Sequence, residues 1–252
     1  MPYKQAINRY FVAQMFLTRL PTPANLQWSE EELAASTSWF PAVGITIGAI
    51  ASAAWIFGNL LWEPHIAAVA AVAVAIIATG AFHEDGLADS ADGIGGAFEL
   101  DKKLAIMRDS RIGTYGSVAL IVVTISKVMA LAMVPPSMIV ATLISAHVIA
   151  RWSSVPLIYN NLYVREQGTG KPFAATVTKT RLLYSSLFTL IVTALCVQLK
   201  ALALLIAVFM FLWIAQTWLR RKLGGITGDT LGAVNSLTEL LVYLVLTAQL
   251  SQ

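Results

Sequence analysis

The chain has 252 residues, of which 57% are hydrophobic and 12% are charged, and its net charge at pH 7 is +3. Soluble domains carry about 25% charged residues, so this composition excludes a soluble protein and predicts an integral membrane protein. The single cysteine, Cys196, excludes an intramolecular disulfide bond.

Residues 1–35 contain no long apolar stretch of the kind found in a cleavable signal. Instead, their aromatic and apolar side chains recur at a spacing that would place them on one side of a helix. This pattern predicts an N-terminal amphipathic helix that lies on the membrane. The side chains concerned are Tyr10, Phe11, Met15, Phe16 and Leu17.

Seven apolar segments follow, each close to the roughly 20 residues that a helix needs to cross the hydrocarbon core. They predict an all-α, polytopic membrane protein with about seven transmembrane helices, built as a single domain over residues 1–252. Pro135-Pro136 and Lys200 mark short turns, so neighbouring helices should form hairpins. The predicted spans are 36–62, 65–82, 116–134, 137–159, 182–199, 201–219 and 231–250.

Basic residues divide the connecting segments between the two sides of the membrane. Most of the 17 Lys and Arg residues precede the first span or follow the second, fourth and sixth, whereas Lys200 lies on the other side. The positive-inside rule therefore places the N-terminus and the connections 83–115 and 160–181 in the cytoplasm, and the C-terminus outside. The residues on the basic side are Lys4, Arg9, Arg19, Lys102, Lys103, Arg108, Arg111, Arg165, Lys171, Lys179, Arg181, Arg220, Arg221 and Lys222.

An acidic run follows the second predicted span: Glu84, Asp85, Asp89 and Asp92 occur with no basic residue among them. On a helix, the three aspartates would lie within about 60° of one face. Clustered carboxylates repel one another, and hard oxygen ligands suit Mg²⁺ bound together with substrate phosphate oxygens. We therefore expect these four acids to hold Mg²⁺ for a phosphoryl-group reaction; the alternative is a solvated acidic loop end.

Three other polar segments bear glycines. Residues 108–111 (RDSR) precede Gly113 and offer N–H donors for phosphate, with membrane anchoring or a surface salt-bridge cluster as alternatives. Residues 165–171 indicate substrate contact only weakly. Residues 224–232 predict an anion-binding turn or a metal ligand at Asp229, although Asp229 as a plain N-cap of the last helix is the simpler interpretation.

Ionisable residues inside the predicted spans are costly and suggest a function by default. They are Lys127 in the third span, His147 and Arg151 four residues apart in the fourth, and Glu239 in the last. Two interpretations stay open. One is substrate binding, and the other is a structural role in which Glu239 pairs with Lys127 or Arg151.

In chain order, these motifs resemble one family, the membrane-bound cobalamin synthases, also called adenosylcobinamide-GDP ribazoletransferases. The resemblance covers nearly the whole chain, and the acidic signature together with the TGDxLGA element is highly specific. The segments that carry it are 16–21 (FLTRLP), 84–93 (EDGLADSADG), 107–113 (MRDSRIG) and 225–233 (GITGDTLGA).

The resemblance implies a Mg²⁺-dependent transferase at the cytoplasmic (inner) membrane that joins adenosylcobinamide-GDP to α-ribazole, or its 5′-phosphate, and releases GMP. The implied partners are these substrates and the lipid bilayer, without nucleic acid; a homo-oligomer stays open. We expect Glu84, Asp85, Asp89 and Asp92 to bind the metal, and Asp92 or Asp229 to act as the base. The expected substrate-binding residues are Arg19, Arg108, Asp109, Arg111, Lys127, Arg151, Arg165 and Thr227.

Two rival functions differ from this one. CDP-alcohol phosphotransferases also carry an aspartate-rich motif that begins with Asp-Gly, but their pattern needs Ala-Arg next, where this chain has Leu87-Ala88. A small membrane transporter is the non-enzyme rival, although the internal repeats typical of transporters are not detected.

Overall fold

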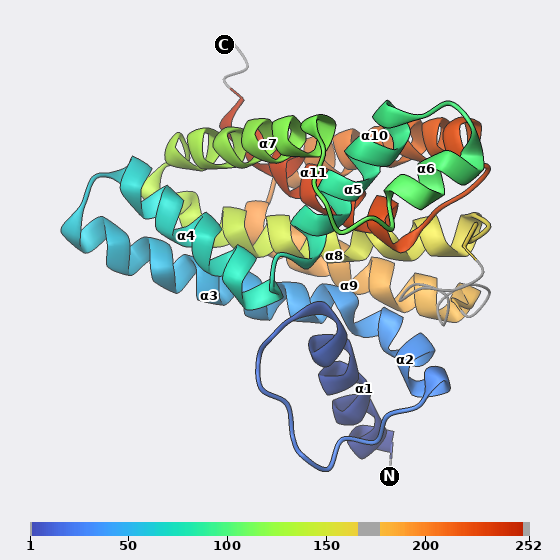
Figure 1. Ribbon diagram of the computed structural model, residues 1–252. Helices are drawn as coiled ribbons and strands as arrows, with labels where there is room; N and C mark the ends of the chain where they lie inside the picture. Colours follow the sequence, from blue (N-terminus) through green and yellow to red (C-terminus); the bar gives the residue numbers. More distant parts are fainter. Residues whose placement is uncertain (1, 166–176, 249–252) are drawn as a thin grey trace.

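In a computed structural model of the chain, residues 2–165 and 177–248 are described, and every regular element within them is a helix (Figure 1). Six segments of these residues are long and apolar enough to cross a membrane, and a seventh crossing results if the bent pair α4–α5 counts as one span. The predicted all-α, polytopic class is thereby confirmed. The elements are α1 (Pro2–Leu17), α2 (Glu30–Ser36), η1 (Thr37–Trp39), α3 (Phe40–Leu61), α4 (Pro64–Thr79), α5 (Phe82–Gly96), α6 (Leu100–Ile106), α7 (Thr114–Ala132), η2 (Pro136–Met138), α8 (Ile139–Asn160), α9 (Lys179–Val197), α10 (Lys200–Leu223) and α11 (Gly228–Thr247).

The N-terminal helix α1 is present and crosses the direction of the main bundle (Figure 1). Val12 and Ala13 are fully buried, and the Tyr10 hydroxyl lies 2.6 Å from Thr46 Oγ1 of α3. Arg9 pairs with Glu32 of α2 at 3.2 Å. Its packed face therefore rests on protein; a place for α1 on the membrane surface stays a prediction.

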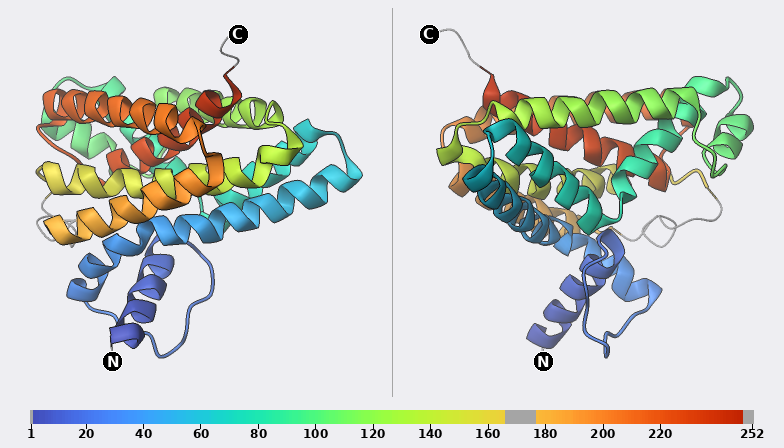
Figure 2. Two further views of the ribbon diagram at one scale, coloured as in Figure 1. Left: turned by 180° about the vertical axis from the view of Figure 1, so that it is seen from behind. Right: turned by 60° about the vertical axis from the view of Figure 1, so that its left-hand side comes forward.

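Helices α3, α8 and α11 build the centre of the bundle. Helix α3 packs along α8, and α11 packs against both α8 and α5. Glycines allow the α3–α8 approach, because a Cβ at Gly48 would lie only 2.7 Å from the Ile144 Cα atom. Figure 2 shows the bundle from two further directions. This tight packing leaves α8 the most enclosed of the long helices.

The second predicted span differs most from expectation. The helix stops at Thr79, turns through 87° and resumes as α5, so the predicted loop 83–115 contains two helices, α5 and α6. Gly80 and Ala81 make the turn with left-handed backbone, at φ 66° and 57°. The acids and glycines of residues 82–96 are typical of a loop, but tertiary partners stabilise them as a helix, as described below.

The basic-rich segments gather at one end of the bundle. The α3–α4 and α7–α8 turns lie at one end in Figure 1, whereas α6 lies at the other. There the Lys103 ammonium donates to the Lys222 carbonyl oxygen at 2.9 Å, and Arg220 Nε donates to Asn161 Oδ1 at 2.7 Å. This arrangement agrees with the predicted division of charge between two sides.

Candidate active site

The acidic helix α5 and the start of α11 meet at two glycines. A Cβ on Gly86 would lie 2.7 Å from the Asp229 carbonyl oxygen, and one on Gly232 would lie 3.3 Å from the Gly86 Cα atom. Only glycine allows two helices to approach this closely. Two of the four motifs that carry the family resemblance, far apart in sequence, therefore share one contact.

Asp85 and Asp89 of α5 lie on the side of this contact that remains open. Asp85 is exposed and Asp89 is half-buried, and the Asp89 carboxylate senses the charges of Asp85 and Asp229. The carboxylates of Asp85, Asp89 and Asp229 thus lie near enough for their charges to interact. The predicted metal ligands Glu84, Asp85, Asp89 and Asp92 stay a prediction. Within the described ranges, however, no three His, Cys, Asp or Glu side chains stand at metal-binding distance.

Arg165 brings a positive charge to these carboxylates. The backbone of Ile226 pairs with the segment before it: Val164 N–H donates to Ile226 O at 3.0 Å, and Ile226 N–H donates to Leu162 O at 2.9 Å. This short pairing places Arg165 beside α11, where its guanidinium donates to Asp229 Oδ2. The weakly predicted contact segment thus reaches the site through its first residue, whereas residues 166–171 lie outside the described part.

The Asp92 carboxylate binds backbone amides of another helix. Its Oδ2 accepts the Gly113 N–H at 2.7 Å and its Oδ1 accepts the Gly116 N–H at 2.9 Å. These amides belong to the N-terminus of α7, where unpaired N–H groups and the helix dipole favour a negative charge. Amides that the sequence offers to substrate phosphate therefore bind the protein's own carboxylate. The predicted roles of Asp92 as a metal ligand and as a base remain predictions.

The interpretation of Asp229 as the N-cap of the last helix is wrong. The N-cap is Thr227, whose hydroxyl accepts the Thr230 N–H at 3.2 Å while Thr230 Oγ1 accepts the Thr227 N–H at 2.9 Å. This reciprocal arrangement frees the Asp229 side chain for Arg165. Thr227 itself is fully buried, so the structure gives it a capping task beside its predicted contact with substrate.

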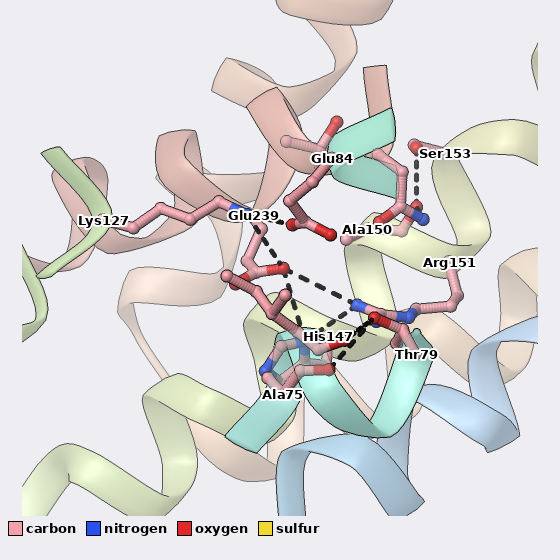
Figure 3. Close-up of polar contacts among 12 residues, drawn as sticks. Ala75, Thr79, Glu84, Lys127, His147, Ala150, Arg151, Ser153 and Glu239 are labelled. Atoms are coloured by element: carbon pink, nitrogen blue, oxygen red, sulfur yellow. Dashed lines mark hydrogen bonds and ion pairs between the residues drawn. The ribbon is translucent and has the colours of Figure 1, made fainter. Parts of the chain in front are cut away.

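The ionisable residues inside the spans form one cluster (Figure 3). Glu239 lies 3.5 Å from the Lys127 ammonium and 3.7 Å from the Arg151 guanidinium. The structural interpretation left open by the sequence, pairing of Glu239 with Lys127 or Arg151, is thereby confirmed with both partners. Lys127 also pairs with Glu84 at 3.4 Å. Substrate contact by Lys127 and Arg151 stays a prediction.

The remaining predicted residues lie at the surface. Arg111 pairs with Asp109 at 2.7 Å, which confirms the salt-bridge alternative for this segment, and the pair lowers the pKa of the Asp109 carboxyl to about 2. Arg108 is exposed. Arg19 lies over the break after α4: its N–H donates to Ala78 O at 2.8 Å, and its side chain covers Gly80. Their contacts with substrate remain predictions.

Comparison with known proteins gives a consistent match. The family model described as cobalamin-5-phosphate synthase matches residues 9–247. An adenosylcobinamide-GDP ribazoletransferase of Shewanella amazonensis is 37% identical over 99% of this chain and 98% of its own. Those of Vibrio cholerae and Ralstonia nicotianae are 37% and 35% identical, over 96% and 97% of this chain and 94% and 96% of their own. No solved structure matches.

Proposed function

The chain belongs to the cobalamin-5-phosphate synthase family, and from this premise we propose how its site carries out the transfer. The protein is a membrane transferase of cobalamin nucleotide-loop assembly. We propose that it joins adenosylcobinamide-GDP to α-ribazole, or its 5′-phosphate, and releases GMP. The observation that carries the proposal is the glycine contact between Gly86 and Gly232, which brings Asp85, Asp89 and Asp229 to one place.

Asp85 and Asp89 are the proposed Mg²⁺ ligands. Their oxygens are the hard donors that Mg²⁺ prefers, and one or two carboxylates with substrate phosphates suffice for such a site. Like-charge repulsion among Asp85, Asp89 and Asp229 favours a cation there. The other two expected ligands hold different partners, because Glu84 pairs with Lys127 and Asp92 accepts two backbone N–H groups. When bound, Mg²⁺ supplies charge stabilisation for the diphosphate.

In this proposal Asp229 acts as the base and Arg165 binds the diphosphate. Asp229 takes the proton of the attacking ribazole hydroxyl. The hydroxyl oxygen forms a bond to the phosphorus that carries cobinamide, the bond from that phosphorus to the bridging oxygen breaks, and GMP leaves. Arg165, which pairs with Asp229 here, exchanges this partner for the diphosphate oxygens when substrate binds, which leaves Asp229 able to accept the proton.

The site is proposed to face the cytoplasm at the inner membrane. The basic segments that the positive-inside rule assigns to that side converge at one end of the bundle, through the contact of Lys103 with Lys222 and of Arg220 with Asn161. Adenosylcobinamide-GDP carries a charged diphosphate that does not cross lipid unaided. A cytoplasmic opening therefore gives this substrate direct access to the site.

The proposal is tested by GMP release from adenosylcobinamide-GDP, with α-ribazole and Mg²⁺, by the purified protein in lipid nanodiscs. Asp89→Asn should lower kcat by about a hundredfold or more, as loss of a group acting on transition-state charge does. Asp101→Asn, which neutralises an exposed acid of α6, is the matched control and should leave kcat unchanged. A wild-type rate in Asp89→Asn contradicts the metal assignment, and absence of GMP release from the wild type contradicts the function.

A further inference from the structure

A buried charge network links four helices in the interior of the bundle (Figure 3). It consists of Glu84 of α5, Lys127 of α7, His147 and Arg151 of α8, and Glu239 of α11. Lys127, His147 and Arg151 are each at most 2% exposed. Groups buried this deeply must neutralise one another, since an unpaired charge in such a place is strongly destabilising.

Glu239 is the centre of the network. Its Oε2 lies 3.5 Å from Lys127 Nζ, 3.5 Å from His147 Nδ1 and 3.7 Å from Arg151 NH1, and its Oε1 accepts the Tyr243 hydroxyl at 3.1 Å. Arg151 also lies 2.8 Å from His147 Nδ1. Because arginine can only donate, that nitrogen accepts and carries no proton. With His147 uncharged, two cations face two carboxylates and the charges balance.

Glu84 stands at the edge of the network and depends on one residue. Its Oε1 lies 3.4 Å from Lys127 Nζ, and its Oε2, buried, has no hydrogen-bond partner among the described residues. Lys127 is its only salt-bridge partner in that part of the chain. Removal of the Lys127 ammonium would therefore leave the Glu84 carboxylate buried and uncompensated.

Helix α5 needs such an anchor because it does not continue α4. The left-handed residues Gly80 and Ala81 separate the two, so the rotation of α5 must be set by its own contacts. Two of its four acids make contacts with α7: Glu84 near the start, through Lys127, and Asp92 toward the end, through backbone amides. The middle two acids, Asp85 and Asp89, are left for chemistry.

We propose that Lys127 is a positioning residue of the transferase: by holding Glu84 in the buried network, it fixes the rotation of α5 and so presents Asp85 and Asp89 to the substrate. This proposal rests on the proposed function for its kinetic readout. In this proposal Glu84 anchors α5 and does not bind the metal. Lys127 binds Glu84 and Glu239 and does not contact substrate.

The test compares Lys127→Met, Glu84→Gln and the double variant, each in the full chain in lipid nanodiscs. Lys127→Met should lower kcat about tenfold or more, since it breaks a buried pair. The double variant removes one charge of each sign and keeps Glu239 paired with Arg151. It should therefore recover to within about threefold of the wild-type kcat, a coupling that direct contacts show in double-mutant cycles. Its KM for both substrates and its Mg²⁺ requirement should equal those of the wild type.

Several outcomes overturn the proposal. If Glu84 binds the metal, Glu84→Gln and the double variant both need more Mg²⁺; if Lys127 binds substrate, the double variant keeps a raised KM. A double variant no better than Lys127→Met, in activity or in folding, also overturns it. Lys200→Met, at the opposite end of the bundle, is the matched loss of one ammonium and should change neither kcat nor KM. Thermal unfolding of the wild type, Lys127→Met, Glu84→Gln and the double variant measures the coupling without turnover, so failure of the proposed function would be recognised separately.

Discussion

The four acids of α5 occupy four different environments. Glu84 is paired with a buried ammonium, Asp85 is exposed, Asp89 is half-buried beside Asp85 and Asp229, and Asp92 accepts two backbone N–H groups. Asp92 therefore acts like an N-cap supplied by another helix. Glycine at positions 113 and 116 makes room for it, because a Cβ at either position would collide with its carboxylate.

The cap predicts the effect of a conservative change at Asp92. Asp92→Asn keeps the size of the side chain but turns an amide NH₂ group toward one of the two backbone donors. We expect the protein to lose about 1–3 kcal/mol of stability, the usual effect of removing a charge-assisted hydrogen bond to a buried donor.

Thermal unfolding in detergent measures this loss, and kcat measured well below the unfolding temperature gives the second readout. The proposed function assigns the base to Asp229, so kcat of folded Asp92→Asn should stay near that of the wild type. A kcat that falls by orders of magnitude without a change in unfolding temperature would return Asp92 to the catalytic role that the sequence suggests. Asp101→Asn serves again as the control on an exposed acid.

At the residue scale, the sequence predicts the candidate site residues well but does not predict their contacts. Residue type and spacing single out the acids of α5, Asp229 and the charges inside the spans. Their partners are not predictable, because Glu84 and Lys127 are 43 positions apart and Arg165 and Asp229 are 64 apart. The exception is Glu239: Lys127 and Arg151 lie inside other predicted spans, and this already suggests that Glu239 pairs with one of them. The role of Gly86 and Gly232 was missed, although a glycine in each motif is a signal for close helix contact.

At the scale of elements, the break between α4 and α5 decides where the acids lie. Ala81 adopts a left-handed conformation that L-residues other than glycine, asparagine and aspartate seldom adopt. Gly80 is held beneath the Arg19 side chain, where a Cβ would lie 2.7 Å from Arg19 Cγ. Because Ala81 is strained in this conformation, the packing of α4 and α5 must hold the turn in place.

Relief of this strain gives an element-scale prediction. Ala81→Gly should raise stability by about 1 kcal/mol, because glycine adopts positive φ without the cost of a Cβ. The same substitution at Ala53, an exposed position inside α3, should lower stability by about 1 kcal/mol. Opposite shifts of the unfolding temperature would support the left-handed turn, and a loss of similar size in both variants would contradict it.

The elements were predicted well where apolar length was the signal and poorly where it was not. The spans now seen as α7, α8 and α10 follow from runs of apolar residues that have few other structures available in lipid. Helix α5 lies in a segment predicted as a loop, because aspartate and glycine are poor helix formers when considered alone. Its stability comes from Lys127 and from the α7 amides, which are tertiary partners.

At the scale of the whole molecule, the bundle has two unlike ends. One end carries the α3–α4 and α7–α8 turns, and the other carries the basic segments, α6 and the contact between residues 162–164 and Ile226 (Figures 1 and 2). If the α4–α5 pair crosses the membrane as one bent span, the number of crossings is seven and the chain ends lie on opposite sides.

Reporter fusions test this layout. A phosphatase that is active only outside the cytoplasm should be active when fused at the C-terminus and inactive when inserted after Gly96, at the end of α5. A fluorescent protein that matures only in the cytoplasm should give the reverse pattern. Phosphatase activity after Gly96 and none at the C-terminus would show that α4 and α5 form a re-entrant pair and that six helices cross.

The buried network also constrains the order in which the protein can be made. Glu84 is synthesised 43 residues before Lys127, and Glu239 belongs to the last helix, α11. A lone carboxylate is not stable against lipid tails, so α5 must stay with water or the insertion machinery until α7 is available. The remaining positive charge, on Arg151 of α8, is neutralised only when Glu239 of α11 is in place. The buried charges of this protein are therefore balanced only after α11 has been inserted, and a nascent chain that stops before α11 keeps one buried charge without its partner.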